Sequence, residues 1–170
     1  MNKRLVCLCA VVAMILGLAC ESRALTLNPF KRSGRIKATS FIIAGNFVES
    51  RLLAELAQYY SKQPILVISP DVDGGDQLFF MPASNNAAPA GPDEFMEIID
   101  HVNPKRIIVL GGEKYVPPKF IDQARSKYSV ITLDSDNWSK NAQTLGELLG
   151  IRKLQPLFDE FKASIDKTAK

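Results

Sequence analysis

The sequence predicts an α/β fold, a three-layer αβα sandwich built on a mainly parallel sheet. Two observations support this prediction. Short aliphatic runs alternate along the chain with segments of helical periodicity, which is typical of βαβ units. Several of the runs are apolar at every position, as central strands of a parallel sheet are. Of the 170 residues, 146 follow the first 24, and this length fits one ordinary domain.

Most of the expected elements have Gly, Pro or Asn at one end. Strands are expected at residues 41–44, 65–68, 106–110 and 130–133. Helices with one apolar face are expected at residues 52–60, 93–102, 117–124, 139–149 and 154–165. The arrangement is flavodoxin-like or Rossmann-like. The last helix is amphipathic and is expected to close the fold by packing on the sheet. We place the α/β domain at residues 36–151 and a C-terminal helix and tail at residues 152–170.

Residues 70–92 interrupt the alternation, because they are rich in Gly, Pro, Ala and Asn. A structureless loop of this length is uncommon in a compact domain. The four large apolar residues at 78–81 are costly to leave in water. They therefore favour a short extra strand or an aromatic flap over a mobile lid.

The first 24 residues have the order of an export signal. Lys3 and Arg4 precede an apolar run over 5–19, and Ser22-Arg23-Ala24 offers a small-x-small cleavage site. We expect cleavage after Ala24, a linker over 25–35, and a protein that is periplasmic, secreted or held in the cell envelope. Lipid attachment at Cys20 is the alternative. The apolar run is shorter than the roughly 20 residues of a spanning helix, so no permanent membrane span is expected.

Composition argues against several functional classes. Without residues 1–24 the chain has 18 basic and 17 acidic residues, scattered along its length, so no nucleic acid partner is expected. All three cysteines precede Ala24, and His101 is the one histidine, which removes a Cys-His dyad. No G-x-G-x-x-G fingerprint, P-loop or G-x-S-x-G elbow occurs. We expect no cofactor, no catalytic residue and no metal site, and we interpret the aspartates of 71–76 as a solvated turn.

Three stretches together resemble a known family. They are Phe41-Ile42-Ile43-Ala44-Gly45-Asn46-Phe47, Lys62-Gln63-Pro64-Ile65-Leu66, and residues 102–113 (VNPKRIIVLGGE) followed by Val116. In this order they resemble the cell wall-binding repeat type 2 family of bacterial surface proteins, over residues 36–151. The chain departs from that family in having a single copy, a longer 70–92 loop, and Asn137 where the family's turn has an arginine.

The resemblance implies a non-enzymatic, exported module that binds a cell-wall or envelope polysaccharide or anionic polymer. It also implies modules that pack side by side, and a homotrimer is the expected assembly of a single copy. The candidate ligand-binding residues follow two strands, where open α/β sheets bind ligands and backbone N–H groups can receive anions. They are Gly45, Asn46, Phe47, Gly111, Gly112, Glu113 and Lys114.

Two alternatives remain open. A small exported hydrolase acting on an envelope glycan would use carboxylates at strand ends, such as Glu49, Glu113 or Asp134. The other alternative is a protein–protein interaction module.

Overall fold

The structure is a computed structural model that describes residues 38–70, 74–83 and 86–168. They belong to one compact unit that spans residues 34–170. The predicted signal peptide, linker, Ala24 cleavage site and Cys20 lie outside the described residues, as do Asp71 and Asp73.

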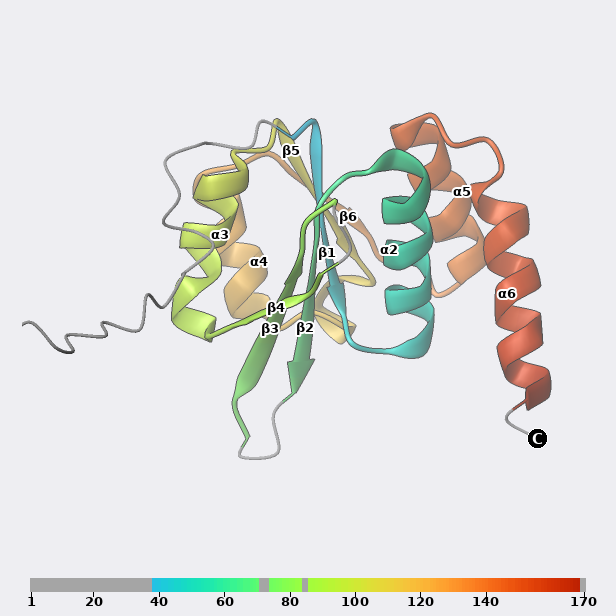
Figure 1. Ribbon diagram of the computed structural model, residues 1–170, viewed down its shortest axis with the longest axis horizontal. Coiled ribbons are helices and arrows are strands. Elements are labelled where there is room, and N and C mark those ends of the chain that lie inside the picture. Colours follow the sequence, from blue (N-terminus) through green and yellow to red (C-terminus); the bar gives the residue numbers. More distant parts are fainter. Residues whose placement is uncertain (1–37, 71–73, 84–85, 169–170) are drawn as a thin grey trace, which may run out of the picture. The chain divides into compact units, whose positions relative to one another are not determined.

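Six strands form one sheet in the order β4-β3-β2-β1-β5-β6 (Figure 1). Their bounds are β1 Ser40–Gly45, β2 Ile65–Pro70, β3 Asp76–Met81, β4 Ala88–Ala90, β5 Arg106–Leu110 and β6 Val130–Leu133. Strand β1 pairs in parallel with β2 and β5, and β5 pairs in parallel with β6. Strand β3 runs antiparallel to both β2 and β4. The sheet is therefore mixed, and the prediction of a mainly parallel sheet was wrong.

The antiparallel half arises from the segment that interrupted the sequence pattern. Of the two alternatives for residues 78–81, an extra strand or an aromatic flap, the structure has the strand, because these residues lie within β3. Leu78 and Phe80 are buried, and the ring of Phe80 lies 6.2 Å from that of Phe41. Apolar side chains on both sides of β3 stabilise it as a sheet strand, and the short β2–β3 connection makes the pair antiparallel.

The centre of the sheet lies in β1, with Ile42 paired with Ile65 of β2 and Ile108 of β5. All three of these side chains are fully buried. Helices cover both faces of the sheet, so these strands are apolar on both sides, as their sequences predicted.

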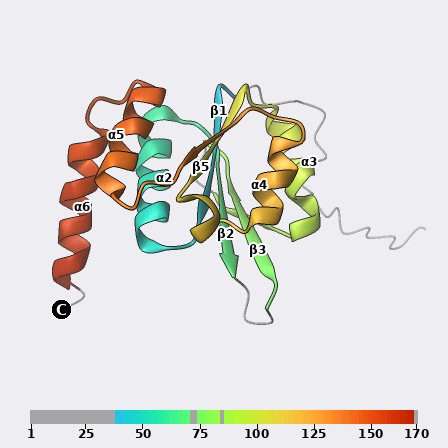
Figure 2. The same cartoon turned by 180° about the vertical axis from the view of Figure 1, so that it is seen from behind.

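The described residues form five α-helices: α2 Val48–Ser61, α3 Phe95–Val102, α4 Pro118–Arg125, α5 Trp138–Leu149 and α6 Leu154–Thr168. Helices α3 and α4 lie on one face, and α2, α5 and α6 lie on the other (Figures 1 and 2). Two short 3₁₀ turns, η2 Pro92–Glu94 and η3 Gly112–Lys114, precede α3 and α4.

Helix α6 does not occupy the position expected from its amphipathic pattern. Its principal neighbours are α5 and α2, so it lies outside these helices rather than directly on the sheet (Figure 1). Leu154 and Phe158 are fully buried and join the core of this side of the molecule. In the part of the chain that the structure describes, no helix is both long enough and apolar enough to cross a bilayer.

Candidate functional site

The candidate site lies at the carboxyl edge of the parallel strands. Strands β1 and β5 are neighbours, but the chain leaves β1 toward β2 on one side and leaves β5 toward β6 on the other. Such a point of reversed strand order is where open α/β sheets bind ligands. Gly45 ends β1 and Gly111 follows β5. The structure therefore brings the two predicted glycine turns together.

Gly45 is required for close packing. A Cβ atom at this position would collide with the backbone carbonyl oxygen of Tyr115 and would lie 2.9 Å from the Phe47 ring. The Gly45 carbonyl also accepts a hydrogen bond of 2.5 Å from the Ser50 hydroxyl. Gly45 thus allows the turn after β5 to rest on the end of β1, and protein atoms fill the space beside it.

Gly111 and Gly112 both have a positive φ, at 85° and 60°. A Cβ on Gly111 would collide with the Tyr115 ring, and one on Gly112 would lie 3.0 Å from the Asp134 Cβ. Backbone conformation and close packing therefore require glycine at both positions. A bulky replacement would disturb the turn itself, so these two positions give no clean test of binding.

Part of the expected rim of backbone N–H groups for an anion is occupied. The Gly111 N–H donates to the Leu133 carbonyl at 2.7 Å, and the Asn46 N–H donates to the Ile68 carbonyl at 2.7 Å. The Phe47 N–H donates to the Gly45 carbonyl at 2.9 Å. Three of the donors that the sequence offered for an anion are thus used inside the protein.

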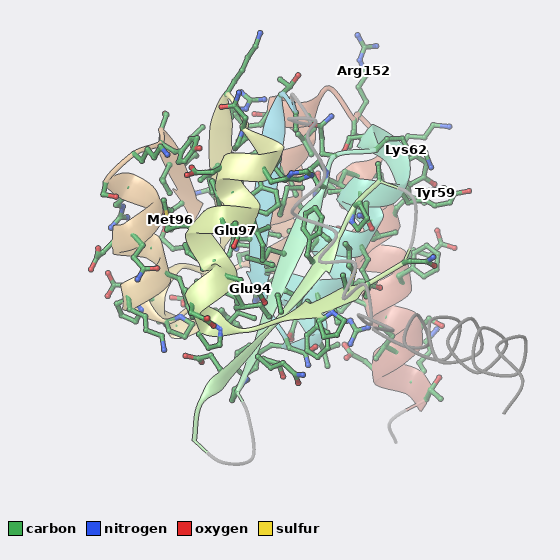
Figure 3. The ribbon with its side chains drawn as sticks, turned by 60° about the vertical axis from the view of Figure 1, so that its left-hand side comes forward. Tyr59, Lys62, Glu94, Met96, Glu97 and Arg152 are labelled. Atoms are coloured by element: carbon green, nitrogen blue, oxygen red, sulfur yellow. The ribbon has the colours of Figure 1, made fainter. Side chains whose placement is uncertain are left out.

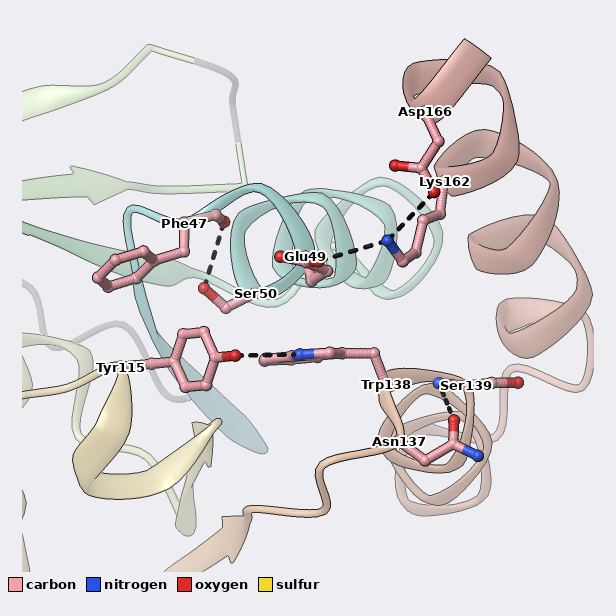
Figure 4. A network of polar contacts seen from close by, with 9 residues as sticks. All are labelled: Phe47, Glu49, Ser50, Tyr115, Asn137, Trp138, Ser139, Lys162 and Asp166. Atoms are coloured by element: carbon pink, nitrogen blue, oxygen red, sulfur yellow. Dashed lines mark hydrogen bonds and ion pairs between the residues drawn. The ribbon is translucent and has the colours of Figure 1, made fainter. Parts of the chain in front are cut away.

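An aromatic row made of Phe47, Tyr115 and Trp138 crosses this edge (Figure 4). The Phe47 and Tyr115 ring centroids are 5.2 Å apart and those of Tyr115 and Trp138 are 5.0 Å apart, each pair meeting edge to face at 89°. The Trp138 indole N–H donates to the Tyr115 hydroxyl at 3.4 Å. Trp138 is 8% exposed and Phe47 is 42% exposed, so the row presents one ring to solvent on a rigid base.

Sequence reasoning included Phe47 but missed the row. Neither Tyr115 nor Trp138 was among the candidate residues. A usable signal was present, because each of the three aromatic residues comes within five positions of the end of a parallel strand.

A cavity of about 400 Å³ opens on the other side of the η3 turn. Its walls come from η3, α4, β6 and the residues after β6: Gly111, Gly112, Glu113, Lys114, Ile121, Arg125, Thr132, Asp134 and Asp136. Four of the seven predicted binding residues line it, together with Arg125 and Thr132, which the sequence did not single out. This clustering is the main support for a ligand site here.

Both cations that line the cavity have acidic neighbours. Lys114 Nζ lies 2.6 Å from Asp136 Oδ1, and these side chains are 71% and 88% exposed. Their hydrogen bond is the main cause that raises the pKa of Lys114 and lowers the pKa of Asp136. The Arg125 guanidinium donates to the Thr132 hydroxyl at 3.3 Å and lies 3.9 Å from an Asp122 oxygen.

Two remaining candidates have structural partners. The Asn46 side chain donates to the Ser69 hydroxyl at 3.1 Å and accepts from Arg51 at 3.2 Å. Glu49 accepts from Lys162 of α6 at 3.3 Å (Figure 4). Glu49 is therefore turned toward α6, whereas Glu113 lines the cavity beside α4.

The described residues contain no group of three His, Cys, Asp or Glu side chains that could hold a metal ion. In comparisons with known proteins, no family model, no curated protein and no solved structure matches this chain.

Proposed function

We propose that this protein is an exported, non-enzymatic module that binds a cell-wall or envelope polysaccharide or anionic polymer. The proposal rests first on the resemblance to the cell wall-binding repeat type 2 family. The structural observation that supports it is the arrangement of the carboxyl edge, where the aromatic row and the charged cavity flank the same turn, η3.

The two parts of the site favour a polymer over a small molecule. Trp138 belongs to the core on the α2 and α5 side of the sheet, with Tyr115 packed against it, whereas Ile121 and Arg125 place the cavity on the α4 side. A ligand that uses both parts must cross the η3 turn. An extended chain does so naturally, because successive units can occupy the row and the cavity.

Co-sedimentation of the purified protein with isolated bacterial envelope tests the proposal. Phe47→Ala removes the exposed ring, and we expect sedimentation to fall about 10-fold, as for one aromatic contact residue. Tyr59→Ala is the matched control. Tyr59 is 67% exposed near the far end of α2, where Lys62 lies 4.9 Å from its ring (Figure 3). Absence of wild-type binding to every envelope fraction, or equal losses in both variants, would contradict the proposal.

The hydrolase alternative has one observation in its favour, because Glu113, Asp134 and Asp136 line a single cavity. Lys114 lowers the pKa of Asp136, which makes Asp136 a poor proton donor. Release of new reducing ends from envelope glycan, abolished by Asp134→Asn, would replace the binding proposal with this one.

The proposed localisation has a separate test. Export with cleavage after Ala24 gives a protein that begins at Leu25. N-terminal sequencing of protein from the envelope or medium should find this start. A lipid-modified start at Cys20 would replace the cleavage site, and an intact leader on cytosolic protein would contradict export.

A further inference from the structure

We infer that the carboxyl edge selects an uncharged, hydroxyl-rich glycan chain over a polyanion, and that Asp134 and Asp136 set this selectivity. The inference rests on the proposed function and narrows its ligand class. It is drawn from the charges and donors at the site, and it differs from the anion-receiving rim that the glycine turns predicted.

The first argument concerns charge. The cavity lining holds two cations, Lys114 and Arg125, and three carboxylates, Glu113, Asp134 and Asp136. Each cation already has an acidic neighbour, since Lys114 pairs with Asp136 and Arg125 with Asp122. A phosphate or carboxylate that entered the cavity would therefore compete for these cations while facing an excess of negative charge.

The second argument concerns backbone donors. Anion sites without spare cations use converging N–H groups at turns or helix starts. Here the N–H groups of Asn46, Phe47 and Gly111 donate to protein carbonyls. Of these three residues Gly111 lines the cavity, so an anion in the cavity loses this backbone donor and still meets the excess of carboxylates.

The third argument concerns what such a lining does recognise. Hydroxyl groups both donate and accept hydrogen bonds. The carboxylates of Asp134 and Glu113 can accept hydrogen bonds from the hydroxyl groups of a glycan. The Arg125 guanidinium and the Thr132 hydroxyl can donate hydrogen bonds to the same kind of group. The exposed Phe47 ring offers an apolar surface that suits the C–H face of a sugar ring, and Tyr115 supports it edge to face at 5.2 Å.

The two aspartates occupy defined positions in the cavity. Asp134 immediately follows β6, and its Cβ would lie 3.0 Å from a Cβ atom on Gly112. The Asp136 carboxylate accepts a hydrogen bond from Lys114 Nζ. A polyanion must separate this pair and then meet Asp134, whereas a neutral chain can hydrogen-bond to both residues without separating them.

The test uses one envelope preparation in three forms: untreated, stripped of phosphate polymers with cold hydrofluoric acid, and amidated at its carboxylates with carbodiimide. We expect the purified wild-type protein to sediment with all three to within about 2-fold, because charge on the polymer contributes little. Soluble dextran sulfate should not displace it. Binding to the untreated form alone would overturn the inference while keeping the proposed function. Binding to no form would overturn both.

Variants test the two residues directly. Asp134→Asn with Asp136→Asn removes two carboxylates from the cavity lining. The double variant should gain binding to immobilised dextran sulfate of at least about 3-fold at low ionic strength, lost on adding salt. Glu97→Gln with Glu160→Gln is the matched control, since it removes two charges from exposed positions on α3 and α6, outside the cavity. An equal gain in the control, or no gain in the double variant, would contradict the role of the two aspartates.

Discussion

Tyr115 connects the two halves of the carboxyl edge. Its backbone carbonyl lies against Gly45, its ring lies against Gly111, and its hydroxyl accepts from Trp138. The first two contacts require a glycine, which has no side chain. The third contact requires the indole N–H of Trp138 as a donor. The glycines of the predicted site therefore act by letting Tyr115 approach, and Tyr115 in turn supports the exposed ring of Phe47.

Gly45→Ala is expected to destabilise the protein by about 1–3 kcal/mol, because the added methyl meets backbone atoms of Tyr115 that have little room to move. Gly75→Ala is the control, since no atom lies within 4 Å of a Cβ at that position. Denaturant unfolding of both variants provides the measurement. Identical midpoints for Gly45→Ala and wild type would show that the two turns are not in contact.

The Lys114–Asp136 pair gives a pH prediction. The pKa of Asp136 lies below its ordinary value of 3.8 because the carboxylate accepts a hydrogen bond from Lys114. A lowered folded-state pKa favours the folded state above the unfolded pKa, and that contribution disappears as pH falls through the folded pKa. Lys114→Met should therefore raise the pKa of Asp136 toward the ordinary value. NMR titration of the Asp136 carboxyl measures this, and an unchanged pKa would mean that the pair does not form in solution.

At the scale of elements, Asn137 has a structural role at the start of α5. Its side chain accepts hydrogen bonds from the N–H groups of Ser139 at 3.0 Å and Lys140 at 3.4 Å. It is the N-cap of α5 (Figure 4). The helix carries Trp138 as its first residue, so the cap also fixes the inner end of the aromatic row.

Asn137→Ala is expected to cost about 0.5–2 kcal/mol of stability, and Asn137→Asp to cost little, because an aspartate side chain also caps a helix. Asn137→Arg should resemble the alanine variant. Thermal unfolding of the three proteins distinguishes these cases. Equal stability of Asn137→Ala and wild type would remove the capping role and would leave the asparagine unexplained.

At the scale of the whole molecule, the family resemblance implies repeats that pack side by side, and this chain carries a single copy. We therefore expect self-association into a homotrimer. Helix α6 forms the outermost layer of its face, and its exposed side includes Phe161 and Ile165, 47% and 39% exposed. Light scattering of the purified protein should give three times the chain mass. A monomer at high concentration would reject the assembly.

Sequence patterns alone predict the alternation of strands and helices and the turns that end the parallel strands, and they leave residues 78–81 as either a short strand or an aromatic flap. These features follow from local signals, because aliphatic runs, helical periodicity and Gly or Pro breaks act within a few residues. The sequence also placed Gly111, Gly112, Glu113 and Lys114 at the end of β5, where they line the cavity. These residues share one turn, so their proximity required no knowledge of the rest of the fold.

Only the tertiary structure decided the antiparallel pairing of β3 and β4, the position of α6 on α2 and α5, and the partners of the turns. Strand β3 can pair with β2 because that edge of β2 is free, and the short connection then makes the pair antiparallel. The apolar stripe of α6 fits other helices as well as a sheet. The aromatic row joins residues that follow three different strands. Likewise, the Gly111 N–H is occupied because β6 lies beside β5 and offers the Leu133 carbonyl. Such contacts between distant segments are set by packing of the whole sheet, and no local pattern encodes them.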